Sequence, residues 1–233
     1  MNVAIMQPYI FPYIGYFQLV NCADYFVFYD DVNFVKKGWI NRNRILSNGH
    51  DLLITVPLVK ASQNRLINEL ELYNEENFKA KFISKIENSY KNAPYYADVI
   101  PLIREIINAE ISNIGEYSAN SILRVSNYLE LNTKFHFSSI LSPESKGIDR
   151  GDRLIYICKK LGGNKYFNAI GGKEIYTKEY FKNNEIDIFF VQTLGVEYSQ
   201  FSRPFVPNLS IIDVLMFNPV SDIRKMLKNH VLI

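Results

Sequence analysis

The hydrophobic and polar positions at the start of the chain predict a strand, a short helix and a second strand. Residues 3–7 form a short apolar run that ends at Gln7 and Pro8. After a turn over residues 8–12 comes a short helix that carries Ile14, Phe17, Gln18 and Cys22, and residues 25–29 form the next apolar run. This order is typical of the opening of a βαβ unit, in which the two strands are parallel.

Two further apolar runs, residues 40–46 and 52–57, flank the sequence Ser47-Asn48-Gly49-His50. Asn-Gly between alternating runs is the strongest short signal of a two-stranded hairpin. We therefore expect an antiparallel ribbon after the first βαβ unit.

From residue 75 to residue 131 the apolar spacing becomes helical, as with Phe78, Phe82 and Ile86, and Pro94 separates the first helix from those over 95–108 and 114–129. Strands and helices then alternate again. This second series predicts strands over 135–139, 166–169 and 188–192 and helices over 151–161 and 173–183. The fold class expected is α/β, with a mixed, mostly parallel, Rossmann-like sheet, a β-hairpin and a helical insertion.

No internal repeat, proline-rich linker or low-complexity tract divides the chain, so we expect a single α/β domain over residues 1–233, with 75–131 as an insertion or cap. The cysteines, Cys22 and Cys158, each lie in an apolar periodic segment, as small buried hydrophobic residues do. No run approaches the roughly 18 apolar residues of a membrane span, and no leader pattern follows Met1, so we expect no membrane span and a cytoplasmic location.

A formal charge of +2 is too small to indicate duplex nucleic acid as a partner. The aromatic content is more informative, because 14% of the residues are Phe, Trp or Tyr and many of them lie between residues 8 and 39. Such amphipathic rings can line a cleft as well as fill a core.

Polar residues follow three predicted strands at the edge where ligands bind to open parallel sheets. Gln7, Pro8 and Tyr9 follow the first strand, Asp30 and Asp31 the second, and the third such group comprises Asn168, Gly171 and Gly172. Gly15 opens the first helix, whose N-terminus would attract phosphate oxygens. The alternative is structural, with Pro8 and Pro12 shaping a turn and Gly15 permitting close packing.

The segment from Lys36 to Arg44 combines positive charge with the single tryptophan of the chain. Strand alternation would place Trp39, Asn41 and Asn43 on one face and Arg42 and Arg44 on the other. Two arginines can bind a diphosphate and an indole can stack on a base or sugar ring, so we interpret the segment as ligand-binding rather than as a solvated edge.

Asp30 and Asp31 could act as a base or metal pair, anchor a substrate amine, or be solvated in a turn. Adjacent carboxylates on an extended segment point to opposite sides, so at most one would face the cleft. Lys60 and Gln63 follow the ribbon and could return to the same cleft, although simple solvation explains them equally well.

The three histidines, His50, His136 and His230, are far apart and lack ligands at metal-binding spacing, so we expect no tightly bound transition metal. The sequence also contains no Walker loop, G-x-S-x-G elbow or complete G-x-G-x-x-G motif. Ser210 is predicted to cap a helix, with Asp213 as its capping-box partner.

The stretch VAIMQPYIFPYIGYFQLVNCADYFVFYDDVNFVKKGWINRNRIL, with TVPLVKASQ, YFNAIGGKEIY and SQFSRPFVPNLSIIDVL later, closely resembles the WbqC-like family over nearly the whole chain. The resemblance implies a role in O-antigen or other surface-polysaccharide biosynthesis, including glycine or acyl transfer to amino sugars. The motif residues that it carries onto this chain are Gln7, Pro8, Tyr13, Gly15, Tyr16, Asp30, Asp31, Trp39, Asn41, Arg42 and Arg44.

The opening strand, turn, glycine-led helix and strand also look like those of the nucleotidylyltransferase and pantothenate-synthetase superfamily. In that superfamily two histidines around a glycine stabilise the phosphates of ATP. Here the corresponding stretch is Tyr13-Ile14-Gly15-Tyr16, which lacks both histidines. Because the histidines are missing, nucleotidyl transfer or adenylate formation is only the second hypothesis.

The first hypothesis is a transferase that adds an acyl or aminoacyl group to the amine of a nucleotide-linked deoxyamino sugar. The donor would be an acyl-CoA, or ATP with an amino acid, and Asp30 or Asp31 would accept the amine proton. A third hypothesis is a non-catalytic module that binds a sugar nucleotide. The expected partners are the sugar nucleotide and, as an oligomeric state open to test, a second copy in a homodimer.

Overall fold

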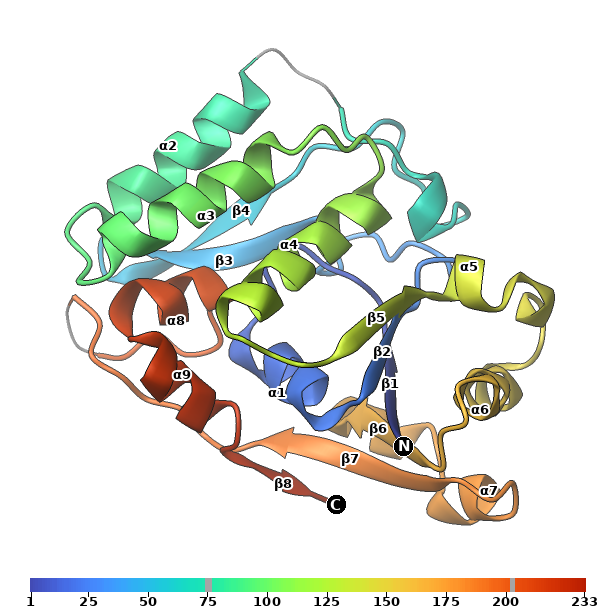
Figure 1. The fold of residues 1–233 in the computed structure, drawn as a ribbon. Helices are drawn as coiled ribbons and strands as arrows, with labels where there is room; N and C mark the ends of the chain where they lie inside the picture. The colour runs from blue at the N-terminus through green and yellow to red at the C-terminus, as the bar shows by residue number, and fades with distance from the viewer. Residues whose placement is uncertain (74–76, 202–203) are drawn as a thin grey trace.

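The computed structural model describes residues 1–73, 77–201 and 204–233, which form a six-stranded sheet and a separate two-stranded hairpin (Figure 1). In spatial order the sheet contains β5 (Lys134–Phe137), β2 (Tyr25–Phe28), β1 (Asn2–Met6), β6 (Lys165–Ala169), β7 (Asp187–Thr193) and β8 (His230–Leu232).

The first five strands of this order are parallel and only β8 is antiparallel. Numbered along the chain within the sheet, the order is 3-2-1-4-5-6, which is the order of Rossmann folds. The predicted α/β class with a mostly parallel mixed sheet is therefore confirmed. The central strands β1, β2 and β6 are largely buried because helices cover both faces of the sheet.

One face of the sheet is covered by α1 (Ile14–Cys22) and the C-terminal helices α8 (Ile211–Phe217) and α9 (Val220–Met226). The other face packs against α6 (Arg150–Lys160) and α7 (Lys178–Lys182). The alternation of β1 shows this division, because Ala4 belongs to the first core and Val3 and Ile5 belong to the second.

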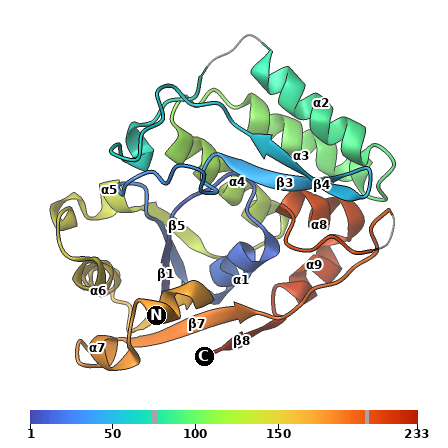
Figure 2. The ribbon, with the colours of Figure 1, turned by 180° about the vertical axis from the view of Figure 1, so that it is seen from behind.

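The segment between β2 and β5 contains the hairpin and the helical insertion, which lie at the end of the molecule away from β7 and β8 (Figure 2). The hairpin pairs β3 (Arg42–Ser47) with β4 (His50–Thr55). Asn48 and Gly49 both have positive φ, of 50° and 79°, as a type I′ turn requires, which confirms the predicted hairpin. It is followed by a 3₁₀ turn, Ile67–Glu69, and by α2 (Phe78–Tyr90), α3 (Tyr96–Asn108) and α4 (Ile114–Tyr128). The predicted start of the helical insertion at residue 75 lies outside the described residues.

Two elements differ from the sequence-based expectation. The predicted strand 135–139 ends at Phe137 because Ser138 begins the short helix α5 (Ser138–Leu141), which a 3₁₀ turn, Pro143–Ser145, follows. The predicted helix 173–183 is divided into a 3₁₀ turn, Ile170–Glu174, and α7, which Thr177 caps.

Ser210 caps α8 as predicted, since its hydroxyl accepts a hydrogen bond from the N–H of Ile212. Asp213 does not complete a capping box. A capping box would need the backbone N–H of Ser210, which donates to the carbonyl of Arg44 instead. The carboxylate of Asp213 accepts hydrogen bonds from Tyr90, Tyr198 and Gln200.

In the described parts of the chain, none of the helices has both the length and the apolar character that crossing a bilayer demands.

Candidate functional site

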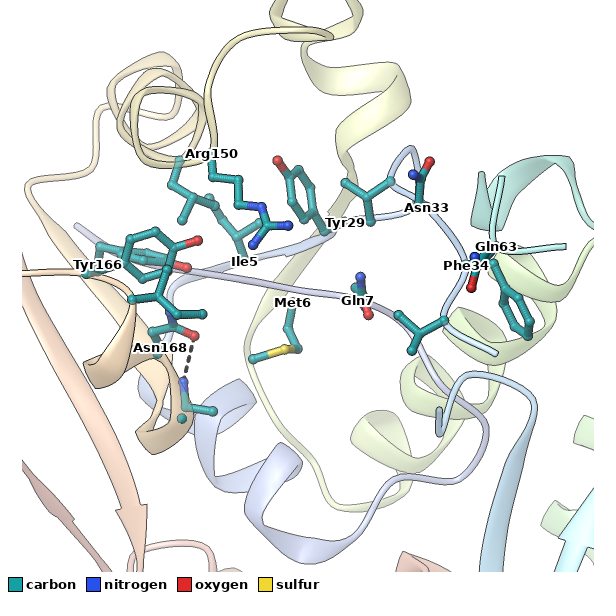
Figure 3. Close-up of a pocket in the computed structure, with 18 of the residues that line it drawn as sticks. Ile5, Met6, Gln7, Tyr29, Asn33, Phe34, Gln63, Arg150, Tyr166 and Asn168 are labelled. Atoms are coloured by element: carbon teal, nitrogen blue, oxygen red, sulfur yellow. Dashed lines mark hydrogen bonds between the residues drawn. The ribbon is translucent and has the colours of Figure 1, made fainter. Parts of the chain in front are cut away.

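An open cleft of about 840 Å³ lies at the carboxyl ends of β1, β2 and β6 (Figure 3). From β1 the chain continues to β2 on one side, and β6 is added later on the other side, so the cleft lies at the topological switch point of the sheet. Ligands of doubly wound sheets bind at this point. We call it the switch-point cleft, and its lining includes Gln7, Tyr29, Lys36, Arg150, Tyr166 and Asn168.

The charged side chains that line the switch-point cleft are cationic. Arg150 is the first residue of α6 and points into the cleft (Figure 3). Lys36 comes from the loop after β2. Neither side chain has a hydrogen bond or an ion pair to another described residue. Among the described residues that line the cleft, none is acidic. The cleft therefore presents positive charge to an anionic ligand.

Neutral polar groups lie between these cations. Figure 3 shows Gln7 in the middle of the cleft, with Tyr166 and Arg150 on one side and Asn33 and Gln63 on the other. The end of β6 contributes Asn168, whose Oδ1 accepts a hydrogen bond from the N–H of Ala169 at 2.8 Å. These amides can bind hydroxyl or carbonyl groups of a ligand.

Gly172 is required for the position of Asn168. A Cβ atom at Gly172 would overlap the side-chain amide of Asn168, whereas a Cβ atom at Gly171 would meet no atom within 4 Å. Two adjacent glycines that both line the cleft therefore have different roles.

Tyrosine rings form the apolar part of the lining. Tyr29, Tyr166 and Tyr176 all contribute, and the guanidinium of Arg153 lies over the Tyr29 ring at 4.8 Å from its centroid. Burial raises the pKa of Tyr29 above its usual value, although the positive charges of Arg153 and Arg150 oppose the shift. The phenol therefore stays protonated at neutral pH and can donate a hydrogen bond to a ligand.

Asp30 and Asp31 are buried, and neither is part of the cleft lining. Asp30 accepts hydrogen bonds from the hydroxyl and the N–H of Ser139, and Asp31 forms an ion pair with Arg153. The one hydroxyl hydrogen of Ser138 is shared between the two carboxylates. Both carboxylates thus point to the start of α5 rather than to opposite sides. The alternation rule fails here because β2 ends at Phe28. The N–H of Asp30 donates a hydrogen bond to the carbonyl of Phe28, and this bond turns the chain.

The geometry gives Asp31 a positioning role. Its carboxylate holds Arg153, and Arg153 in turn packs on Tyr29 in the cleft. A proton-accepting role for either aspartate stays a prediction that this burial and pairing do not favour.

The loop after β1 is held by buried polar side chains from distant parts of the chain. The carbonyl of Phe11 accepts from Asn43 and from Ser210, and its N–H donates to Ser121. Phe11 itself has φ of 42°, a left-handed conformation that is strained for a bulky residue. Backbone strain of this kind concentrates at functional sites, and this loop links Gln7 in the cleft to Tyr13 at the start of α1.

A second, smaller pocket of about 310 Å³ lies beyond this loop. Its lining comprises Tyr9, Tyr13, Trp39, Asn43, Arg44 and Asn208, and we call it the tryptophan pocket. Trp39 lies on the same side as the arginines, with the guanidinium carbons of Arg42 and Arg44 at 5.9 and 5.4 Å from its ring centroid. The predicted division of faces is therefore wrong, because Trp39 belongs to a turn, closed by its carbonyl accepting from the N–H of Arg42, and not to the extended strand.

The predicted site residues are thus divided rather than gathered in one cleft. Gln7, Gln63, Asn168 and Gly172 line the switch-point cleft, and Tyr9, Tyr13, Trp39 and Arg44 line the tryptophan pocket. The remaining substrate-binding candidates are absent from both linings: Pro8, Gly15, Tyr16, Asn41, Arg42 and Lys60.

Several of these six have structural contacts. The hydroxyl of Tyr16 donates to the carbonyl of Gln7, and Asn41 donates to that of Val56. Arg42 donates to the carbonyl of Gly38 at 2.8 Å. Gly15 leaves space for the ring of Tyr13, which a Cβ atom would overlap. Lys60 is exposed.

The sequence did not point to Arg150, Tyr29, Tyr166 or Tyr176 as cleft residues. Tyr29 stands at the end of a predicted strand and could have been found by the same rule as Gln7. Arg150 precedes a predicted helix, but its direction depends on how α6 packs on the sheet. Among the described residues, no group of three or more His, Cys, Asp or Glu side chains is arranged to hold a metal ion.

Comparison with known proteins gives a family but not an activity. An "Uncharacterized protein Rv1507c" of Mycobacterium tuberculosis (strain ATCC 25618 / H37Rv) is 26% identical over 220 residues, which cover 93% of each chain. No solved structure gives a significant match. The sequence pattern of the WbqC-like protein family matches residues 7–225, so the chain belongs to that family.

Proposed function

We propose that the protein is a transferase that binds a nucleotide-linked amino sugar in the switch-point cleft and adds an acyl or aminoacyl group to its amine. The observation that carries this proposal is the pair of cations, Arg150 and Lys36, which have no hydrogen bond or ion pair to any described residue and lie at the switch point of a Rossmann-like sheet. Membership of the WbqC-like family is consistent with an enzyme of surface-polysaccharide biosynthesis.

The cleft matches the three parts of a sugar nucleotide. A diphosphate can bind to the guanidinium of Arg150 and the ammonium of Lys36 through charge-assisted hydrogen bonds. A base can stack on one of the tyrosine rings, as at Tyr29 or Tyr176, and sugar hydroxyls can bind to the amides of Gln7 and Asn168.

The reaction is a nucleophilic acyl substitution. The neutral amine nitrogen of the sugar attacks the activated carbonyl carbon, a C–N bond forms, and the bond from carbon to the leaving group breaks. With an acyl-CoA the leaving thiolate takes up the proton that the amine loses. An aminoacyl adenylate forms when the amino-acid carboxylate attacks the α-phosphorus of ATP and pyrophosphate leaves; in the transfer step AMP then leaves and the proton passes to solvent. Since these donors and sugar nucleotides are cytoplasmic metabolites, we propose the cytoplasm as the location.

The binding step is tested by calorimetric titration of UDP- and dTDP-linked amino sugars into the wild type and Arg150→Ala. A guanidinium that contacts phosphate contributes on the order of 1.5 to 3 kcal/mol, so affinity should fall about ten- to a hundredfold. Arg224→Ala is the matched control, because Arg224 lies on α9 and pairs with Glu130 away from the cleft. Equal affinity in the wild type and both variants would remove the cleft as the sugar-nucleotide site.

The transfer step is tested separately by mass spectrometry. The sugar nucleotide is incubated with the protein and either acyl-CoA donors or ATP and glycine. An acyl or glycyl mass increment on the sugar nucleotide supports the transferase. Binding without any product across these donors would contradict it and favour the non-catalytic binding module.

A further inference from the structure

The tryptophan pocket combines a stacking surface with a cation. Trp39 is the single tryptophan of the chain and its side chain is 46% exposed. Arg44 packs on this ring, and its side chain is 36% exposed. An indole beside a partly exposed guanidinium fits a planar ring that carries an anionic group.

The rest of the pocket is aromatic or amide in character. Tyr9 and Tyr13 contribute phenol rings, and α1 begins directly after Tyr13 without a side-chain cap. The N-terminus of that helix adds positive potential on this side. Asn43 is fixed by its bonds to the loop carbonyls of Ile10 and Phe11, so it shapes the pocket, while Asn208 has no hydrogen bond from its side chain to another described residue.

Two chain segments connect the tryptophan pocket with the switch-point cleft. Gln7 lines the cleft and Tyr9 the pocket, and in the same way Lys36 lines the cleft and Trp39 the pocket. Two residues of extended chain span at most about 7 Å and three at most about 11 Å, so groups bound in the two places can approach each other closely. This arrangement suits two substrates that must meet.

We propose that the tryptophan pocket binds the adenine nucleotide part of the acyl donor, with the base stacked at Trp39 and a phosphate at Arg44. This inference rests on the proposed function, which places the sugar nucleotide in the switch-point cleft and leaves the donor without a site. Both donor classes that fit the reaction, an acyl-CoA and an acyl adenylate, contain adenosine with phosphate. The shared chemistry is therefore an adenine nucleotide, and its source is either coenzyme A or ATP.

The fluorescence of the single tryptophan reports this site directly. AMP, which carries the shared chemistry, is titrated into the wild-type protein, and saturable quenching of Trp39 is expected. Parallel titrations with coenzyme A and with ATP identify the source, because the true donor should saturate at a lower concentration than the other.

Variants separate the pocket from the cleft. Arg44→Met keeps an apolar stem against Trp39 and should weaken AMP binding by about tenfold or more, as expected for the loss of a charge-assisted contact. Arg42→Met is the matched control, since Arg42 also lies near Trp39 but does not line the pocket, and it should change affinity by less than about threefold. Arg150→Ala should leave AMP binding unchanged. Trp39→Phe, followed by calorimetry, should lose on the order of tenfold through weaker stacking.

Three results would overturn the inference: no saturable quenching by AMP, coenzyme A or ATP; equal affinity in Arg44→Met and the wild type; or quenching by UDP- or dTDP-sugars that Arg150→Ala abolishes. The first two leave the proposed function intact if the sugar nucleotide still binds in the cleft, so the two failures are distinguishable. The third would mean that one sugar nucleotide occupies both places.

Discussion

Asp31 and Arg153 form an ion pair in which each side chain is only 4% exposed, and this pair joins the end of β2 to α6. Ser145 and Ser138 satisfy further polar groups of the pair. Arg153 also packs on Tyr29, so the pair connects the core of the protein to the wall of the switch-point cleft.

We expect Asp31→Asn to destabilise the protein by about 3 to 5 kcal/mol. The substitution leaves the guanidinium of Arg153 buried without its counter-charge, and removal of one partner of a buried pair typically costs this much. Urea unfolding monitored by circular dichroism measures the loss. Asp187→Asn is the control, because its pair with Lys182 is largely exposed and should contribute little. A stable Asp31→Asn protein that bound substrate but formed no product would instead restore a catalytic role for Asp31.

The sequence was sufficient for the fold because long apolar runs alternate with helical spacing and Asn48-Gly49 specifies its own turn. The strand-end rule also predicts Gln7, Asn168 and Gly172 at the edge of the sheet where they line the cleft, since the end of a buried strand can be read locally. It did not predict that Asp30 and Asp31 would bind to α5, because their partners are more than 100 residues away in the chain. Arg150 could not be placed either, since its direction depends on the packing of α6. Trp39 was assigned to the wrong face because a turn replaced the extended segment on which alternation depends.

We expect Gly172→Ala to weaken binding of the sugar nucleotide by about fivefold, while Gly171→Ala changes it by less than about twofold. A methyl group at Gly172 must displace the amide of Asn168, and one neutral hydrogen bond contributes about 1 kcal/mol. A methyl group at Gly171 meets no neighbour. Calorimetric titration beside thermal melts separates binding from stability. Equal losses in both variants would show that Asn168 does not contact the ligand.

The buried carboxylate of Asp213 should make stability depend on pH. Burial raises its pKa, although hydrogen bonds from Tyr198, Gln200 and Tyr90 oppose the shift. The folded state therefore binds this proton more tightly than the unfolded state, whose pKa is about 3.9. As pH rises from about 4 through the folded pKa, the contribution of Asp213 to the free energy of unfolding should fall.

Comparison with Asp213→Asn isolates this contribution, because the amide stays neutral at every pH. The free energy of unfolding of the wild type minus that of the variant should decrease from about pH 4 upward, through the folded pKa of Asp213, and then level off. Urea unfolding at several pH values measures it. A difference that increased with pH would mean that the three hydrogen bonds outweigh burial.

Asp51 lies on the hairpin beside the tryptophan pocket. Its Oδ2 is 3.4 Å from Nη1 of Arg44, and the two side chains are 48% and 36% exposed. An exposed pair of this length contributes little to stability, so Asp51→Asn should leave the melting temperature nearly unchanged. It also removes a negative charge that competes with a phosphate for Arg44. We therefore expect AMP to bind about two- to fivefold more tightly to the variant at low salt, measured by quenching of Trp39. At 1 M salt the Debye length is only about 3 Å, so most of this gain should disappear.

Glu87→Gln, which changes an acidic residue paired with Arg104 on the helical insertion, is the charge-matched control and should show no gain. In the double variant Asp51→Asn/Arg44→Met the gain should also be absent, because it depends on the guanidinium. If Asp51→Asn alone left AMP affinity unchanged at low salt, or if the gain survived without Arg44, then Arg44 would not be the group that binds the phosphate.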